Sequence, residues 1–574
     1  MVTDSASSSG HTTPPPTHDE LLETVRVRSL KIIFVSLNNT IFADGSRILS
    51  AALRKQGHDV HFVCLTLDGD SYYSDSVLQQ FSDLVGKHEA ELVLYSFLSD
   101  NFLRASKVTE RLYADHPDVT QVWGGVHCTI APEESIKHCK IVCQGEGDEA
   151  LPEFVEKFAN GEDYTDTANF WFMDDDGNVK SNEMRPLMLD LDRMPWPDYE
   201  IDTHYVLDEG QIKPMTIELL EKYHNNAPLG FPTYPVLSSR GCAFRCSFCY
   251  NATYKQIFAG QKSVRFRSLP DVVDELRSMK DRFPFFRSFF FSDDDFFLRS
   301  KKALSEFNVL AREKIPDLLY DAWWGSTATP ASLSKEKLDL MFDIGFRVVA
   351  VGVQTGSEDF NKRIYDRDFP NDLFVEKMWM IDKHYGRKMV VTLDFIVDCP
   401  YETEADTLET VKLIQRLPNW VSLAVFTFVF YPGSPLYKRA IEAGEITANP
   451  EVYNAKSFQP FEHKGHSYVD HVMIAMGCMN YLMPGWLVSF LLSKPMLFLG
   501  RIAPQWMLDL VDWKHRYNKL WAKNQAAALG LGEQPRRRWW SLFRGSQKPL
   551  PAQDAEVMQE RKSIDQWTKG SLTG

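Results

Sequence analysis

The sequence predicts an α/β protein with an N-terminal doubly wound parallel sheet, a partial (β/α)6 barrel of the TIM type and a mainly helical C-terminal region. Three observations lead to this prediction. Apolar runs of strand length alternate with helical stretches, as in parallel sheets that helices cover on both faces. The alternation occurs in two separate blocks. The chain of 574 residues is also longer than one ordinary core requires, so several domains are expected.

The first block extends over residues 29–160 and follows a leader, residues 1–28, whose Ser, Thr and Pro content predicts disorder. Its strands are expected at 30–37 and 60–65 and within 91–101, 120–134 and 140–150. Sheets of this kind bind ligands at the carboxyl ends of their strands, and glycines there let the backbone approach a large flat or phosphorylated ligand. The candidate positions are Ser96, Gly124, Gly125, Gly145 and Gly147.

Residues 161–233 are predicted to be a connector, because 190–200 contains prolines and turn-forming aspartates. The strand–helix rhythm returns in the second block, residues 234–450. Six strands are expected within 234–242, 287–297, 319–330, 347–358, 388–400 and 422–435. Six β/α units make an incomplete barrel, whose chemistry is expected at the carboxyl ends of the strands.

Residues 451–574 form the predicted helical region with apolar and basic runs. The 22 residues of 472–493 carry no formal charge and could span a bilayer by length. Pro484-Gly485 interrupts this run, so a buried or interfacial helical hairpin is favoured over a true span. Within 536–548, Trp539 and Trp540 stand beside three arginines, which suits either an anionic membrane boundary or a solvated basic tail.

Charge and cysteine usage limit the functional classes. The net charge of −15 argues against a general nucleic-acid binder, which normally carries a basic excess. No signal peptide is visible, and nine cysteines in this length are no disulfide scaffold. We expect a cytoplasmic protein, with peripheral membrane contact through its C-terminal region as a further expectation. Six cysteines are predicted to be buried thiols: Cys64, Cys128, Cys139, Cys143, Cys399 and Cys478.

The other three, Cys242, Cys246 and Cys249, lie in "GCAFRCSFCY" with the spacing C-x-x-x-C-x-x-C. Thiolates at these positions in a loop can converge on one metal centre. A structural zinc site needs four ligands, usually from two pairs, and no second pair follows nearby. An iron–sulfur cluster fits better, because soft thiolates favour it. Three cysteines on four irons leave one iron open for a small bidentate ligand.

The motif "CAFRCSFC" resembles the cluster-binding loop of radical S-adenosylmethionine enzymes, with Phe248 just before the third cysteine. The resemblance continues in "FFFSDDDFF", "GVQTGSE", "DFIVDCPYETEAD" and "FYPGSPLY", at the ends of the second, fourth, fifth and sixth strands. It implies a [4Fe-4S] cluster on the three cysteines and S-adenosylmethionine nearby. The implied cofactor contacts in the barrel are Phe248, Asp293, Asp294, Gln354, Thr355 and Ser357.

One subgroup of this family carries an N-terminal cobalamin-binding, Rossmann-like domain, which residues 30–151 resemble through "LRKQGHDV", "ELVLYSF", "GGVHCTI" and "CQGEGDEA". The resemblance implies cobalamin at the Ser96 and glycine positions named above. The signature D-x-H-x-x-G, whose histidine ligates cobalt, has no match after the first strand, so no histidine of that loop is expected under the cobalt. His127 is either a ligand or a packed turn histidine.

The fifth-strand segment departs from the family's usual Gly-Leu-Pro-Gly, because this chain has Asp398-Cys399-Pro400-Tyr401. Tyr401 is expected to narrow that end of the pocket, and Cys399 is assigned no catalytic role.

The resemblance implies reductive cleavage of S-adenosylmethionine to a 5′-deoxyadenosyl radical, with C-methylation of an unactivated carbon as the leading hypothesis. The alternatives are oxidative ring closure, as in the anaerobic cyclases of tetrapyrrole synthesis, a cobalamin outside the methyl pathway, and a non-catalytic sensor or electron carrier. The expected partners are a reductant such as flavodoxin or ferredoxin and a small, hydrophobic or lipid-like substrate, but no nucleic acid. The apolar tail, the Trp/Arg cluster within 536–548 and Trp323-Trp324 at the end of the third strand motivate the hydrophobic substrate.

Overall fold

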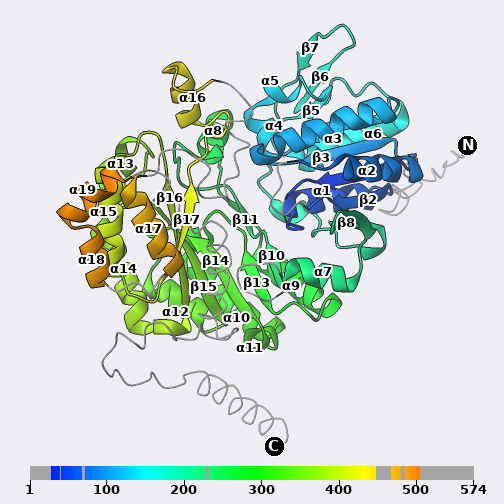
Figure 1. The fold of residues 1–574 in the computed structure, drawn as a ribbon. Coiled ribbons are helices and arrows are strands. Elements are labelled where there is room, and N and C mark those ends of the chain that lie inside the picture. The colour runs from blue at the N-terminus through cyan, green and yellow to red at the C-terminus, as the bar shows by residue number, and fades with distance from the viewer. Residues whose placement is uncertain are drawn as a thin grey trace, which may run out of the picture.

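The computed structural model describes residues 28–503, apart from 39, 67–71, 226–231, 448–466 and 480–484. The predicted leader, except for its last residue, and the Trp/Arg run of 536–548 therefore lie outside the described residues. Two α/β units lie beside each other, and α8 lies between them (Figure 1).

The N-terminal unit is a nine-stranded sheet in the order β7-β6-β5-β4-β3-β1-β2-β8-β9. Its five central strands are parallel: β1 (Lys31–Ser36), β2 (Asp59–Cys64), β3 (Leu92–Ser96), β4 (Thr120–Gly124) and β5 (Ile141–Cys143). Alternate residues of β1 enter separate cores on the two faces, because successive strand side chains point to opposite sides. The predicted doubly wound sheet is confirmed.

Helices cover both faces of this sheet. α1 (Asp44–Lys55) and α6 (Gly147–Asn160) supply Leu53 and Phe154 to the core on one face. α2 (Asp75–Lys87) and α3 (Phe102–Asp115) supply Phe81 and Val108 to the core on the other. Two short helices, α4 (Val126–Ile130) and α5 (Pro132–Ser135), follow β4.

The predicted connector, residues 161–233, instead extends the sheet at both edges. It contains β6 (Phe170–Met173), β7 (Val179–Ser181), β8 (His204–Asp208), β9 (Gln211–Pro214) and α7 (Ile217–His224). β6 pairs antiparallel with β5, and β8 pairs parallel with β2. The aspartates and prolines of 190–200 form the crossing between the edges, where Asp198 accepts hydrogen bonds from Ser50 (2.6 Å) and Arg54 (2.7 Å) of α1.

The second unit confirms the partial barrel, because its six strands are parallel and adjacent in chain order. They are β10 (Thr233–Val236), β13 (Ser288–Phe291), β14 (Trp323–Ala328), β15 (Phe346–Gln354), β16 (Val390–Val397) and β17 (Ser422–Thr427). A separate two-stranded ladder joins β11 (Ser239–Arg240) to β12 (Arg265–Phe266). The helices are α8 (Tyr250–Ile257), α9 (Leu269–Arg282), α10 (Lys301–Lys314), α11 (Leu318–Asp321), α12 (Lys335–Phe342), α13 (Glu358–Arg363), α14 (Asn371–His384), α15 (Glu404–Gln415) and α16 (Pro435–Glu442).

Trp323 and Trp324, which predict a hydrophobic substrate, lie at the amino end of their strand. Trp323 and Trp324 begin β14, whereas the chemistry of such barrels is expected at the carboxyl end. Trp324 is fully buried among the rings of Phe289, Phe291 and Phe307. Packing therefore accounts for this pair, which no longer supports a hydrophobic substrate.

The uncharged run of 472–493 divides between two environments. α17 (Tyr468–Met479) packs against α15 and the edge strand β17 and buries Val469, Val472 and Met473. Its first half is thus a core helix that covers an open edge of the barrel. α18 (Gly485–Leu491) and α19 (Lys494–Ile502) follow. Among the described residues no single helix has the length and hydropathy to cross a membrane. α18 and α19 together have that length and hydropathy, but their axes are bent by 56° relative to each other.

Candidate active site

The cysteine loop connects β11 to α8, and its course is fixed at both ends. At its start Gly241 has φ +84°, and a Cβ at this position would lie 2.1 Å from the carbonyl oxygen of Ser263. Only glycine fits such a close approach of two backbones. At its end Cys249 has extended backbone angles and precedes α8 as the N-cap residue. The three thiols are thereby held on one short turn.

These three thiols differ from the other described cysteines. Cys64, Cys128, Cys139, Cys143 and Cys399 are buried, as predicted, whereas Cys242, Cys246 and Cys249 are partly exposed; the Cys478 side chain lies outside the described residues. Burial raises the pKa of Cys242 to about 11 and that of Cys249 to about 12, and the charges of Asp294 and the neighbouring thiols add to the rise. A metal centre reverses this, because a coordinating thiol is deprotonated.

The donor set fits a cluster better than a single ion. No group of three His, Cys, Asp or Glu side chains within the described part of the chain could hold one metal ion. The cysteine charges nevertheless act on one another's pKa, so the thiols share one neighbourhood. Ligands of a single ion must all lie within about 2.3 Å of it, whereas in a multi-iron cluster each thiolate binds a different iron. This arrangement suits an iron–sulfur cluster.

Of the three aspartates after β13, only Asp294 faces open space. Its side chain is exposed, and its carboxylate accepts a hydrogen bond from Asn251 Nδ2 of α8 at 3.2 Å. Protein nonetheless surrounds it closely enough for desolvation to raise its pKa, a combination typical of a group on a concave surface. Asp294 is therefore available to a ligand beside the cysteine loop.

Asp293 has a different position. It is buried and accepts hydrogen bonds from the Ser238 amide (2.8 Å), the Ser238 hydroxyl (2.6 Å) and the Ser239 amide (2.8 Å). It thus fixes the turn between β10 and β11, immediately before the cysteine loop. The sequence pattern could not separate it from Asp294, because both residues follow the end of β13, where side chains no longer alternate regularly between the two faces of the sheet.

The carboxyl ends of β15 and β16 carry unusual backbone conformations. Gln354 ends β15 with φ +75°, and Asp398 follows β16 with φ +65°. Non-glycine residues in this region cost on the order of 1–3 kcal/mol and are concentrated at functional sites. Arg367 donates a hydrogen bond to the carbonyl of Gly352 (2.8 Å); burial raises the pKa of Cys246, and the charge of Arg367 opposes that rise. Gln354 and Arg367 therefore lie close to the cysteine loop.

Thr355 and Ser357 are buried and bound within the protein. The Thr355 hydroxyl lies 3.1 Å from that of Thr410, and the Ser357 hydroxyl donates to Asp406 Oδ1 at 2.6 Å. Both partners belong to α15, so these side chains fix the loop after Gln354. Phe248 lies against Tyr365, with ring centroids 4.7 Å apart.

Two residues beyond those picked from the sequence, Arg367 and Asp394, also belong to this site. Asp394 lies beside Gly352 of β15 and Ala424 of β17 in the sheet register, on the inner face of the barrel. The outer face of β16 belongs to the main core, and burial raises the pKa of Asp394 to about 7. An aspartate within the apolar strand "VVTLDFIV" was the available sequence signal.

The glycine loops of the N-terminal unit meet the barrel at α8. Gly145 has φ +87°, and a Cβ there would lie 2.6 Å from Met184 Cε and 3.3 Å from Phe258 Cζ, at the end of α8. Gly125 has φ +97°, and its Cβ would lie 2.6 Å from the Phe97 amide and 3.0 Å from Ser96 Oγ. Gly147 begins α6, and Gly124 ends β4. The loops that end β3, β4 and β5 thus include every residue named for this domain.

His127 is a packed histidine in α4. It is fully buried, its Nδ1 lies 3.0 Å from Ser99 Oγ, and the rings of Phe97 and Phe102 adjoin it. Burial lowers its pKa to about 3, so the ring is neutral at physiological pH. These contacts correspond to the packed alternative rather than to a cobalt ligand.

Tyr401 does not extend into the barrel as expected. Its hydroxyl donates to Glu445 beyond α16, and the Arg439 guanidinium of α16 lies 4.8 Å from its ring centroid. Tyr401 therefore joins the loop after β16 to α16. Cys399 is 3% exposed and its pKa is raised to about 12 by burial, which agrees with the absence of a catalytic role.

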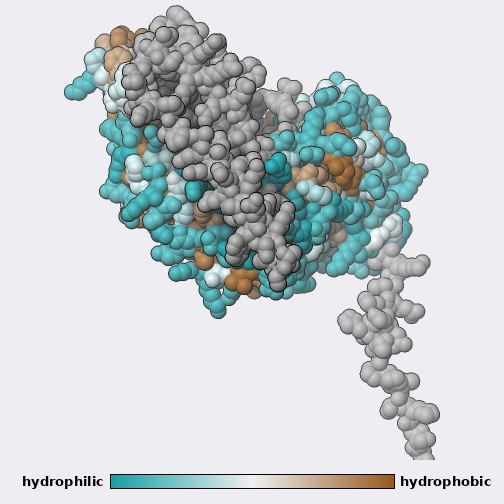
Figure 2. Space-filling view, turned by 90° about the horizontal axis from the view of Figure 1, so that it is seen from below, coloured by the Kyte–Doolittle hydropathy of each residue, from teal (hydrophilic) through white to brown (hydrophobic). Residues whose placement is uncertain are grey.

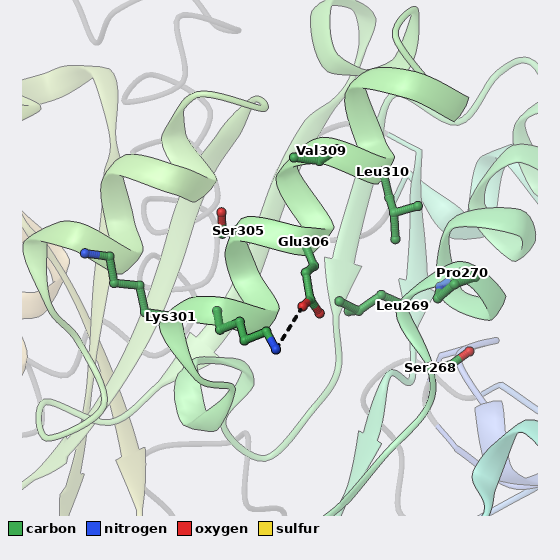
Figure 3. Close-up of a pocket in the computed structure, with 9 residues that line it drawn as sticks. Ser268, Leu269, Pro270, Lys301, Ser305, Glu306, Val309 and Leu310 are labelled. Atoms are coloured by element: carbon green, nitrogen blue, oxygen red, sulfur yellow. Dashed lines mark ion pairs between the residues drawn. The ribbon is translucent and has the colours of Figure 1, made fainter.

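An open groove of about 900 Å³ lies elsewhere, on the outer helical layer between α9 and α10 (Figure 3). Lys302 and Glu306 form an ion pair across one turn of α10 at 3.8 Å. None of the lining residues belongs to the site described above.

Both units match models of known protein families. A model of the radical SAM superfamily matches residues 236–414, and a model of the B12 binding domain matches residues 18–155. An uncharacterized methyltransferase of Pyrococcus horikoshii is 24% identical over 395 residues, which cover 68% of this chain and 77% of the relative. An anaerobic magnesium-protoporphyrin IX monomethyl ester cyclase of Cereibacter sphaeroides is 20% identical over 418 residues, 69% of this chain and 60% of the relative.

Among solved structures, the radical S-adenosylmethionine methyltransferase TsrM of Kitasatospora setae, with cobalamin and a [4Fe-4S] cluster bound, superposes with a TM-score of 0.55. The match covers 87% of this chain and all of TsrM at 14% identity, so it shows a shared fold.

Proposed function

We propose, from the premise that the chain is a radical SAM enzyme with an N-terminal B12-binding domain, that it transfers a methyl group to an unactivated carbon of a small molecule. Its cofactors in this proposal are a [4Fe-4S] cluster, S-adenosylmethionine and cobalamin. One observation carries the proposal: the loop with Gly145 in the B12-binding domain lies against the end of α8, the helix that directly follows the cysteine loop. Methyl transfer between a corrinoid and a radical requires such proximity.

Two sets of residues would hold these groups. Cys242, Cys246 and Cys249 would bind the cluster, and the loops with Ser96 and the glycines at 124, 125, 145 and 147 would hold the corrinoid. When bound, the cluster supplies the electron that cleaves S-adenosylmethionine to a 5′-deoxyadenosyl radical, and cobalamin carries the methyl group. The protein's own contribution is to bind, orient and exclude water.

Polar side chains around the thiols offer complementary partners for S-adenosylmethionine. Asp294 presents a carboxylate to its ammonium group, and Arg367 presents a guanidinium to its carboxylate. Gln354 and Asp394 supply further acceptors on the inner face of the barrel. Val348, Val390 and the partly buried Trp323 form a small apolar cluster separate from the outer core.

Methyl transfer predicts a definite product balance. With candidate substrates, dithionite and methyl-labelled S-adenosylmethionine under anaerobic conditions, we expect equal amounts of 5′-deoxyadenosine, S-adenosylhomocysteine and singly methylated, labelled product. The same reaction should proceed when flavodoxin or ferredoxin replaces dithionite as the electron donor. Protein that forms no 5′-deoxyadenosine, with cluster and corrinoid both present, would contradict the proposal.

Oxidative ring closure is the second candidate, because the chain resembles an anaerobic magnesium-protoporphyrin cyclase over 69% of its length. The same assay separates the two reactions. A cyclase yields a product that has lost hydrogens and carries no label, whereas a methyltransferase yields a labelled product heavier by one methylene group. An unlabelled, dehydrogenated product would therefore replace methyl transfer by cyclisation.

For the C-terminal region we propose peripheral contact with a membrane surface, through which a lipid-like substrate could enter. Five apolar side chains on α18 and α19 are more than half exposed: Trp486, Phe490, Phe498, Leu499 and Ile502. Hydrophobic residues gather at the margin of the molecule where these two helices lie (Figure 2). An aromatic and aliphatic face of this kind is typical of helices that lie in a membrane interface.

A flotation assay with vesicles of mixed neutral and anionic phospholipid tests this contact. We expect the protein to float with the vesicles and the variant Trp486→Ser/Phe498→Ser to lose at least about 90% of this binding, because both anchors leave the apolar face. Leu189→Ser is the matched control, since Leu189 is 65% exposed on another part of the molecule. Equal flotation of all three proteins, or of none, would refute the proposal.

A further inference from the structure

A network of ion pairs joins the two domains between the glycine loop and the cysteine loop. Glu146 stands between Gly145 and Gly147, and Asp148 follows in the first turn of α6. Arg240 of β11 donates two hydrogen bonds to Asp148, at 2.6 and 2.9 Å. Arg265 of β12 donates two to Glu146, at 2.8 and 2.6 Å. Two bidentate pairs thus cross one domain boundary.

The two pairs form one unit. Arg240 and Arg265 face each other in the β11–β12 ladder, and Arg240 also lies 3.5 Å from Glu146. The hydroxyl of Tyr254 in α8 donates a hydrogen bond to Glu146 Oε1 at 2.9 Å. Glu146 therefore contacts three barrel residues, one each from β11, β12 and α8, and β11 and α8 flank the cysteine loop.

Little water reaches this network. The side chain of Arg265 is 1% exposed, that of Asp148 is 7% exposed, and those of Arg240 and Glu146 are each about one-sixth exposed. Burial alone would raise the pKa of Glu146, but the hydrogen bond from Arg265 and the charges of both arginines hold it below its ordinary value. Removing one partner would leave a buried charge without compensation.

The position of the network gives it more than a general role in stability. Arg240 is the residue directly before Gly241-Cys242, so its guanidinium is anchored at the base of the cysteine loop. Glu146 is anchored between the two glycines assigned to the corrinoid. A planar, bidentate guanidinium–carboxylate pair fixes orientation as well as distance. Movement of one loop away from the other would break four hydrogen bonds at once.

We infer that Glu146, Asp148, Arg240 and Arg265 are positioning residues that hold the corrinoid loop in register with the cysteine loop, so that the corrinoid site depends on an arginine of the barrel. This inference deepens the proposed function, because it assumes that the glycine loop binds cobalamin. It assigns to Arg240 an effect on a cofactor that its own domain does not hold.

The test replaces Arg240 of the barrel and measures the response of the glycine loop in the N-terminal domain. In Arg240→Gln, amide hydrogen exchange in the peptide 141–150 should become at least about tenfold faster, and the Kd for cobalamin should rise at least about tenfold. In Arg240→Lys both the exchange rate and the Kd should lie between those of the wild type and of Arg240→Gln, because lysine keeps the charge but loses the bidentate geometry. Iron content after reconstitution should stay at the wild-type value, which shows that the cysteine loop itself is folded.

Two further variants make the test selective. Asp317→Asn removes an exposed ion pair of the same barrel, in which Arg277 contacts Asp317 at 2.7 Å, and should change neither quantity. The charge swap Asp148→Arg/Arg240→Asp should restore protection and cobalamin affinity above those of Arg240→Gln, a rescue that general loss of stability would not give.

Unchanged exchange in Arg240→Gln would overturn the inference. Wild-type protein that binds no cobalamin would overturn the proposed function and the corrinoid part of the inference with it. The exchange measurement needs no cofactor, so it then still decides whether the two loops are coupled.

Discussion

Replacing any one of Cys242, Cys246 and Cys249 by alanine is expected to lower the rate of S-adenosylmethionine cleavage at least about a thousandfold. The three thiols are the partly exposed cysteines of the described chain, and they lie on one turn fixed by Gly241 and α8. Because each would bind a different iron, the loss of one leaves the cluster with a second open iron. The measurements are 5′-deoxyadenosine formed with dithionite and iron bound per chain.

Cys139→Ser provides the control for this series. Cys139 is buried in the N-terminal domain, where its thiol donates to the carbonyls of Gln121 and Ile141, and serine keeps a donor at that place. This variant should bind iron and cleave S-adenosylmethionine as the wild type does. A cysteine-loop variant that binds full iron and cleaves at the normal rate would show that its thiol is no cluster ligand.

The arrangement of the barrel could be predicted from sequence because its strands are buried on one face and half-buried on the other. "FRVVAVGVQ" and "VVTLDFIV" are largely apolar runs, and polar residues end or follow each run at the same edge of the sheet. The cysteine motif could be predicted for another reason: its spacing is local and needs no tertiary information. Both signals are carried by short stretches of chain.

The edge strands of the first sheet could not be predicted in this way. β7 is exposed at every position, and β9 is exposed or half-buried throughout, so neither shows the apolar run of a central strand. β7 and β9 each pair with the strand just before them, so their place in the sheet depends on the pairing of β6 with β5 and of β8 with β2, which lies far away in the chain. Residues 161–233 therefore resemble a linker in sequence although they complete a sheet.

The roles of polar residues near the site were the least predictable part. Asp293 and Asp294 are neighbours of the same type, yet one is hydrogen-bonded within the turn before the cysteine loop and the other faces open space. Ser357 likewise donates its hydroxyl to Asp406, a residue of another helix. Such partners are set by tertiary contacts, which no spacing rule encodes.

Gly241→Ala is expected to reduce cluster incorporation to about one-tenth or less of the wild-type value, although it leaves all three cysteines in place. An alanine Cβ would lie 2.1 Å from the Ser263 carbonyl oxygen and 2.8 Å from its carbonyl carbon. Both atoms belong to backbone that leads directly into β12, so no side-chain rotation can relieve the contact. The loop must move, and the thiols move with it.

Gly260→Ala separates this contact from the cost of the backbone conformation itself. Gly260 has φ +80°, close to the +84° of Gly241, but a Cβ there would meet nothing within 4 Å. Both variants therefore share the left-handed penalty of about 1–2 kcal/mol, and only Gly241→Ala adds the collision. Iron and sulfide bound per chain after anaerobic reconstitution should fall in Gly241→Ala and remain near the wild-type value in Gly260→Ala. Equal losses in the two variants would mean that backbone strain, and not the approach of Ser263, controls the geometry of the cysteine loop.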